Sequence, residues 1–170
     1  MTPSEYCVQR ITSEYVESED RLRLCAEVDA GQRVVLWLTQ RLANRLVTAL
    51  WRWLGRGWPD VARPEVWQEF AQDRARQSLQ PQAKVNAEGA RANWRVDSVD
   101  LTYAEGAVQL RFVGAQSTPV VLSLTELPLR QWLAILESLY RSADWPLSAW
   151  PQGSDSYTSA NSTPATRVLH

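Results

Sequence analysis

Histidine is almost absent from this chain: of its 170 residues only the last, His170, is a histidine. A Ser–His or Cys–His nucleophile pair, or a zinc site built on imidazoles, therefore lacks its central group. The seven glycines are scattered, and neither a GxxxxGK[ST] nor a GxGxxG phosphate loop occurs. The acidic run at 17–20 could supply paired carboxylates, but its place between two predicted strands favours a solvated turn. We therefore expect no enzymatic activity, no cofactor and no metal.

Cysteine is also scarce, and long apolar runs are missing. Cys7 and Cys25 form no CxxC pair, so we expect two reduced thiols. The first twenty residues are acidic and polar, unlike a signal peptide, and no apolar run approaches the roughly 20 residues that span a bilayer. The net charge of −1 predicts no general attraction to nucleic acid or membrane. These features predict a cytoplasmic protein that makes no membrane contact.

The pattern of apolar residues predicts three strands, a helical hairpin, three more strands and a closing helix. Alternation marks strands near 11–15, 22–28 and 34–38, and Thr39 then fits the N-cap of a helix that runs to about Leu54. A second helix begins at Pro64. Its narrow apolar stripe, which we expect to face the core, consists of Val66, Trp67 and Phe70.

The second half of the chain reads as a strand meander that leads into an amphipathic helix. Residues 81–93 lack periodicity and are interpreted as a mobile connection. Strands at 94–103, 107–113 and 119–125 follow, with a bulge near Asp97, where the alternation changes phase. A helix begins near Glu126. The order predicts an α+β fold: an antiparallel sheet or small sandwich of about six strands with an inserted helical hairpin.

The composition changes sharply near Pro151. Residues 1–150 contain all the periodic segments, and their number suits a single globular domain. From residue 151 to residue 170 the chain is polar, and only Tyr157, Val168 and Leu169 could bury useful apolar area. Ordering the backbone costs about 1–2 kcal/mol per residue, more than those side chains return. We expect a disordered tail.

Arginines are concentrated on one side of the first predicted helix. Between Gly31 and Pro59 there is no acidic residue, whereas the preceding hairpin is rich in acids. At 100° per residue, four arginines fall within about 60° of one another: Arg41, Arg45, Arg52 and Arg56. The stripe could pair with the acidic hairpin, inside the molecule or across a dimer. It could instead bind an anionic partner; membrane contact would require the helix's apolar face to be free.

The chain has nine tryptophans, which is many for a domain of this size. Trp58, Trp145 and Trp150 lie beside proline or near the end of the domain, where burial within one molecule is not guaranteed. Tryptophan and arginine are enriched at interaction hot spots. Together with the missing catalytic chemistry, they favour a protein-interaction or scaffold module that forms a homodimer. A second hypothesis is nucleic-acid binding, with the four arginines on phosphates and Trp58 stacked on a base.

The order of elements resembles that of one known superfamily. The stretch Trp94–Tyr140, in which a meander leads into a helix, is similar to the globular head domain shared by DNA end-joining scaffold proteins and the centriolar cartwheel protein. The resemblance implies a small β-sandwich interrupted by a helix-turn-helix, and head-to-head association. In that superfamily a long coiled coil follows, whereas this chain meets Pro146. The resemblance therefore implies no coiled-coil dimerisation and transfers no functional residue.

Overall fold

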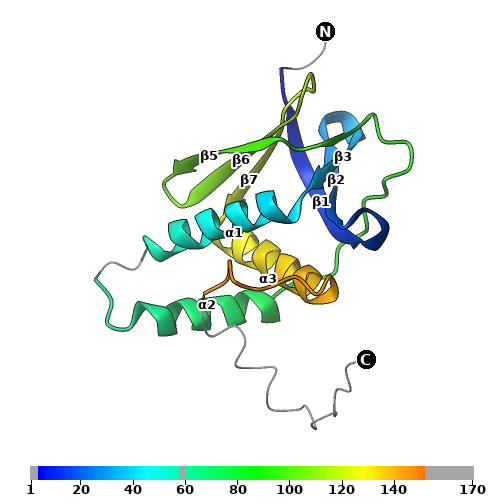
Figure 1. Cartoon of the computed structure of the whole chain (residues 1–170). Coiled ribbons are helices and arrows are strands. Elements are labelled where there is room, and N and C mark those ends of the chain that lie inside the picture. Colours follow the sequence, from blue (N-terminus) through cyan, green and yellow to red (C-terminus); the bar gives the residue numbers. More distant parts are fainter. Residues whose placement is uncertain (1–3, 58–59, 152–170) are drawn as a thin grey trace, which may run out of the picture.

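The computed structural model describes residues 4–57 and 60–151, which form an α+β fold in three layers (Figure 1). A curled sheet is covered on one face by α1 and α3, and α2 packs on the outside of α3. The strands are β1 (Tyr6–Val16), β2 (Arg21–Val28), β3 (Arg33–Leu38), β4 (Ala92–Arg95), β5 (Ser98–Ala104), β6 (Ala107–Val113) and β7 (Val120–Thr125). The helices are α1 (Gln40–Gly55), α2 (Pro64–Gln77) and α3 (Glu126–Ser142).

The sheet is mixed and has seven strands, close to the predicted number of about six but with two parallel pairings that the prediction of an antiparallel sheet did not include. The order is β4-β3-β2-β1-β7-β6-β5. The hairpins β1–β2 and β2–β3 and the meander β5–β6–β7 are antiparallel as predicted. The two halves of the sheet join through a short parallel pairing of β1 with β7, and β4 pairs parallel with β3. Local alternation predicts strands but does not show which distant strand each one pairs with.

The change of phase near Asp97 is a passage from one end of the sheet to the other, and not the predicted bulge. β4 and β5 are consecutive in the chain yet lie at opposite ends of the strand order. Between them the backbone N–H of Val96 donates to the carbonyl of Trp37 in β3 (2.9 Å). The next N–H, that of Asp97, donates to the carbonyl of Val113 in β6 (2.8 Å). Two adjacent residues thus connect the two halves of a sheet that curls until its ends meet.

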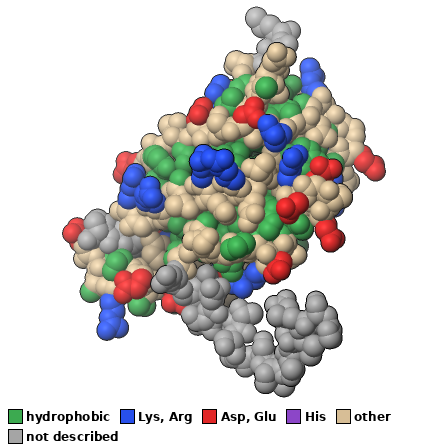
Figure 2. Space-filling view, viewed as in Figure 1, with side chains coloured by type: hydrophobic (Ala, Val, Ile, Leu, Met, Phe, Trp, Pro, Cys, Tyr) green, Lys and Arg blue, Asp and Glu red, His purple; other side chains and the backbone are tan. Residues whose placement is uncertain are grey.

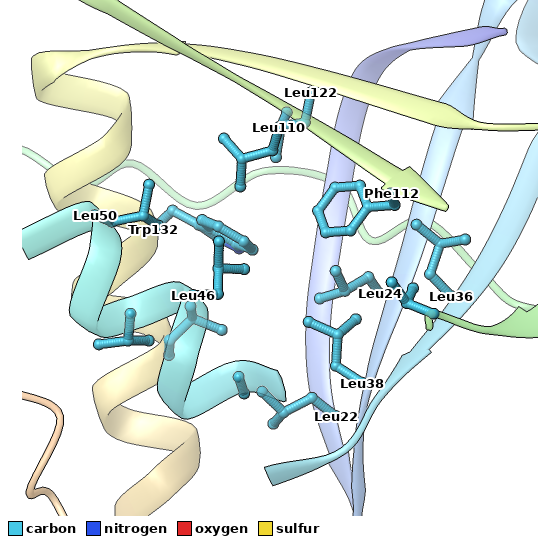
Figure 3. Close-up of a cluster of buried hydrophobic side chains, with 14 of the residues drawn as sticks. Leu22, Leu24, Leu36, Leu38, Leu46, Leu50, Leu110, Phe112, Leu122 and Trp132 are labelled. Atoms are coloured by element: carbon cyan, nitrogen blue, oxygen red, sulfur yellow. The ribbon is translucent and has the colours of Figure 1, made fainter. Parts of the chain in front are cut away.

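The helix α1 forms where the sequence predicts it. The hydroxyl of Thr39 accepts a hydrogen bond from the backbone N–H of Leu42, which satisfies one of the free donors at the helix start. The apolar side of α1 is buried, with Leu46 and Leu50 directed at the sheet and at Trp132 of α3 (Figure 3). From the sheet, the same core receives leucines of β2, β3, β6 and β7 and Phe112.

The helix α2 is oriented opposite to the prediction. Two of its glutamines face inward: the side-chain amide of Gln72 donates to the carbonyl of Arg130 (2.8 Å), and the amide oxygen of Gln68 accepts from the Arg130 guanidinium. Arg76 pairs with the buried Glu137 of α3. The predicted core stripe faces outward instead, with Val66 and Phe70 about half exposed. The reason is that α3 presents the charged side chains of Arg130 and Glu137 to α2, and these pair with polar side chains of α2.

The connection from α2 to β4 is anchored to the sheet, which corrects the interpretation of residues 81–93 as mobile. Val85 is buried and packs with Cys25 and Val35 in a small second cluster. Its backbone N–H donates to the hydroxyl of Thr12 in β1 (2.9 Å). The apolar contact and the hydrogen bond both hold this segment against the outer face of the sheet.

The segment that follows α3 belongs to the core. Trp145 and Trp150 pack edge-on against the ring of Tyr140, with centroid separations of 5.0 and 4.5 Å. Trp145 also donates from Nε1 to a carboxylate oxygen of Asp20, beyond the end of β1 (3.1 Å). These contacts extend the globular unit to residue 150. The predicted disordered tail at 151–170 lies, apart from Pro151, outside the described residues.

Candidate functional site

The four predicted arginines lie together on the solvent side of α1. Arg41, Arg45, Arg52 and Arg56 are all exposed. Figure 2 shows basic side chains grouped along the length of this helix. Within the described part of the chain none of the four forms an ion pair. The basic face of α1, by which we mean these four side chains, is therefore open to an anionic partner.

Two acids of the neighbouring hairpin, Glu14 and Glu27, have other partners. Glu14 accepts from Arg23 (2.7 Å) and Lys84 (2.5 Å), and Glu27 pairs with Arg10 (2.9 Å). Burial works to raise the pKa of Glu14, but the hydrogen bonds from Lys84 and Arg23 outweigh it and hold that pKa below its ordinary value. The idea that these acids neutralise the basic face of α1 inside one molecule therefore finds no support in the described residues.

An aromatic pair extends the basic face at the end of α1. Trp53 stacks with Tyr103 of β5 at a centroid separation of 6.2 Å, and the guanidinium of Arg56 lies 5.7 Å from the Tyr103 ring centre. Tyr103 is 42% exposed. Sequence reasoning missed Tyr103 because it comes from the sheet and becomes a neighbour of α1 only in the fold. Trp58, which was expected to stack in this region, lies outside the described residues.

An open cavity of about 350 Å³ lies at the other end of the basic face, where α1 begins. It is lined by Thr39, Arg41, Leu42, Arg45, Arg95, Val96 and Asp97. Arg95 belongs to β4, and Asp97 follows it in the passage to β5. Arg95 pairs with Asp97 at 3.3 Å, with both side chains well exposed. The sequence gives no signal for Arg95, because only the curl of the sheet brings it to α1.

A second surface is the apolar face of α2, formed by Val66, Trp67 and Phe70. Their exposed fractions are 50%, 47% and 56%, and the rings of Trp67 and Phe70 meet edge-on. Large apolar side chains that are exposed singly are ordinary, but three neighbours on one helix make a patch of the kind that marks an interaction site.

The remaining tryptophans predicted to contact a partner are placed inside the molecule. Trp145 is 7% exposed and Trp150 is 4% exposed, so both work as core residues of the monomer. Their rings are covered by Tyr140 and its neighbours and are therefore not accessible to a partner. Of the seven predicted contact residues, the structure thus brings the four arginines together on one face.

The described residues show no metal centre, and of their two free thiols Cys7 is exposed and Cys25 is buried. No group of three or more His, Cys, Asp or Glu side chains in them is arranged to hold an ion. Burial raises the pKa of the Cys25 thiol, which keeps it protonated and unreactive. None of the helices in residues 4–57 and 60–151 has the length and apolar content needed to cross a bilayer.

Comparisons with known proteins identify no relative: no protein-family model matches the chain, and no curated protein or solved structure is significantly similar to it.

Proposed function

We propose that this protein is a non-enzymatic interaction module of the cytoplasm that self-associates through the apolar face of α2. The observation that carries the proposal is the orientation of this helix. Its polar side is turned into the molecule against α3, and Val66 and Phe70 are left about half exposed. Leaving such side chains in water gives up the free energy of burial, about 25 cal/mol for each Å² of apolar surface. A partner that covers them recovers this free energy.

A second copy of the chain suits this face because the helix is complementary to itself. Phe70 lies near the middle of α2. At 100° per residue, Trp67 and Arg74 lie on the same side of Phe70. When two such helices pack antiparallel about a two-fold axis, positions on the same side meet, so Arg74 of one copy reaches Trp67 of the other. A guanidinium over an indole ring is a favourable contact. The resemblance to head domains that associate with one another also supports this proposal.

We expect the full-length protein to be a dimer at micromolar concentration and Phe70→Glu to raise the dissociation constant at least about a hundredfold. The introduced carboxylate would be buried opposite its own symmetry mate, and an unpaired charge at an interface costs several kcal/mol. Sedimentation velocity over a range of concentrations measures the effect. The control is Thr102→Glu, which adds the same charge at an exposed position of β5. A wild-type protein that stays monomeric, or a Phe70→Glu variant that dimerises like the control, contradicts the proposal.

A second candidate function is binding of single-stranded nucleic acid along the basic face of α1. The observation in its favour is that four exposed arginines have no ion pair in the described residues, and that the last of them, Arg56, lies beside the exposed ring of Tyr103. A phosphate backbone is held by such a row, and a base stacks on an exposed aromatic ring.

If the basic face of α1 binds single strands, four phosphate contacts give a log–log salt dependence with a slope of about −3 to −4. The double variant Arg52→Glu, Arg56→Glu should then abolish binding of a fluorescent oligothymidylate in anisotropy titrations at low salt. Arg91→Glu, an exposed arginine on the α2–β4 connection, is the matched control. An affinity that does not depend on salt concentration, or that falls equally in the double variant and in the Arg91→Glu control, counts against this function.

A further inference from the structure

The cavity where α1 begins is positively charged on balance. Three of its lining side chains are arginines, and the single acid is Asp97. Arg41 and Arg45 are one turn apart on α1 and have no ion pair with any described residue. Arg95 has Asp97 as its partner at 3.3 Å, but in that pair the side chains are 58% and 44% exposed. Exposed pairs of this kind are worth little, so Arg95 is available to a stronger anionic partner.

The arginines that line the cavity come from two different elements, α1 and β4, whereas a row of surface arginines comes from a single helix. Arg41 and Arg45 come from the first turns of a helix, and Arg95 comes from the last residue of β4. The backbone N–H groups of the first helical turn contribute further partial positive charge, because only one of them is capped by Thr39. Guanidinium groups that converge on one volume can each give two parallel hydrogen bonds to a tetrahedral oxyanion.

We propose that this cavity binds the phosphate group of a small phosphorylated ligand. Three arginines and one aspartate leave two net positive charges, which a phosphate monoester of charge near −2 balances and a single carboxylate does not. The volume of about 350 Å³ exceeds what one phosphate fills, and the cavity is open to solvent, so the rest of the ligand has room beside the phosphate. The site is separate from the apolar face of α2 and does not depend on self-association.

Isothermal titration of the full-length protein with inorganic phosphate and with pyrophosphate, in a low-salt chloride buffer at pH 8, tests the proposal. We expect both anions to bind, and Arg95→Gln and Arg45→Gln each to weaken binding about tenfold through the loss of a charge-assisted hydrogen bond. Arg91→Gln, at an exposed arginine outside the cavity and outside the basic face of α1, is the matched control and should change the affinity less than twofold. Asp97→Asn should strengthen binding several-fold, because it removes the only acid in the lining.

Oligothymidylate, which carries phosphodiesters and no monoester, separates the two sources of phosphate. If oligothymidylate binds and the small anions do not, the arginines bind a polynucleotide backbone and the proposal is overturned. Equal losses from Arg91→Gln and Arg95→Gln, or weaker binding by Asp97→Asn, overturn it as well. Circular dichroism checks the folding of each variant. Should Arg95→Gln fail to fold, Arg45→Gln, whose side chain is exposed, decides the outcome alone.

Discussion

Replacing Trp150 with alanine should lower the free energy of unfolding by about 3–5 kcal/mol, the usual cost of removing a large aromatic side chain from a core. The Trp150 ring is 4% exposed and packs edge-on against Tyr140 at 4.5 Å. The Tyr140 hydroxyl in turn donates to the side chain of Asn44 in α1 (2.8 Å), so the lost contact loosens the attachment of α1 to α3. Urea denaturation followed by far-UV circular dichroism measures the change.

Trp150→Phe is the informative comparison for this substitution. The Nε1 atom of Trp150 is buried without a hydrogen-bond partner among the described residues, so phenylalanine sacrifices no hydrogen bond and keeps an aromatic ring beside Tyr140. We expect it to cost less than half as much as alanine. A loss below about 1 kcal/mol for Trp150→Ala would show that the segment after α3 adds nothing to the core, and the domain would then end near Ser142.

The substitution Gly114→Ala should destabilise the protein by about 1–3 kcal/mol or more, the range observed for overpacking. Gly114 follows β6, and a Cβ atom there would lie 2.4 Å from Cε3 and 2.7 Å from Cζ3 of Trp94. It would also lie 3.1 Å from the carbonyl oxygen of Arg95. The added methyl group therefore pushes β4 away from the end of β6, at the place where the curled sheet comes together.

Two further variants separate this clash from a general intolerance of alanine. Gly55→Ala places a Cβ at the end of α1 with nothing within 4 Å, so we expect no loss of stability. In a Trp94→Val background the steric conflict is relieved, and Gly114→Ala should then cost less than about 0.5 kcal/mol. Thermal melts of the four proteins of this double-mutant cycle provide the measurement. An unchanged cost in the Trp94→Val background would place the cause elsewhere than in this contact.

The parts of the fold that the sequence predicted are those decided by local periodicity. Thr39 and the spacing of the leucines of α1 determine where that helix starts and which side it buries. The same spacing predicts that the four arginines share the outer side. By contrast, the pairing of β1 with β7 and of β4 with β3 joins segments that are far apart in the chain. No local pattern carries that information.

The error on α2 has a different cause. The stripe of Val66, Trp67 and Phe70 identifies the apolar side of the helix, but it does not determine which side is buried. The opposite side carries Gln68, Gln72 and Arg76 at intervals of four residues, which meet Arg130 and Glu137 of α3. That regular polar spacing, together with Arg130 and Glu137 among the apolar residues on the buried side of α3, was the available signal.

The cavity at the start of α1 could be predicted only in part. Arg41 and Arg45 follow from the helical wheel, because α1 alone sets their side. Arg95 and Asp97 approach them because the backbone passes from β4 to β5 beside the start of the helix. A reader of the sequence sees these four residues as two unrelated pairs. In the folded protein all four line the same cavity.

The parallel pairing of β1 with β7 has a consequence for how the chain acquires its structure during synthesis. Tyr6 and Cys7 pair with Val120 and Val121, so β1 cannot complete its pairing until β7 has been synthesised. Until β7 and α3 have left the ribosome, the apolar sides of β2, β3 and α1 remain uncovered. Contacts between such distant segments also slow folding, because a long loop must close before they form. A nascent chain stalled before β7 should therefore be the species most prone to aggregate and most dependent on chaperones.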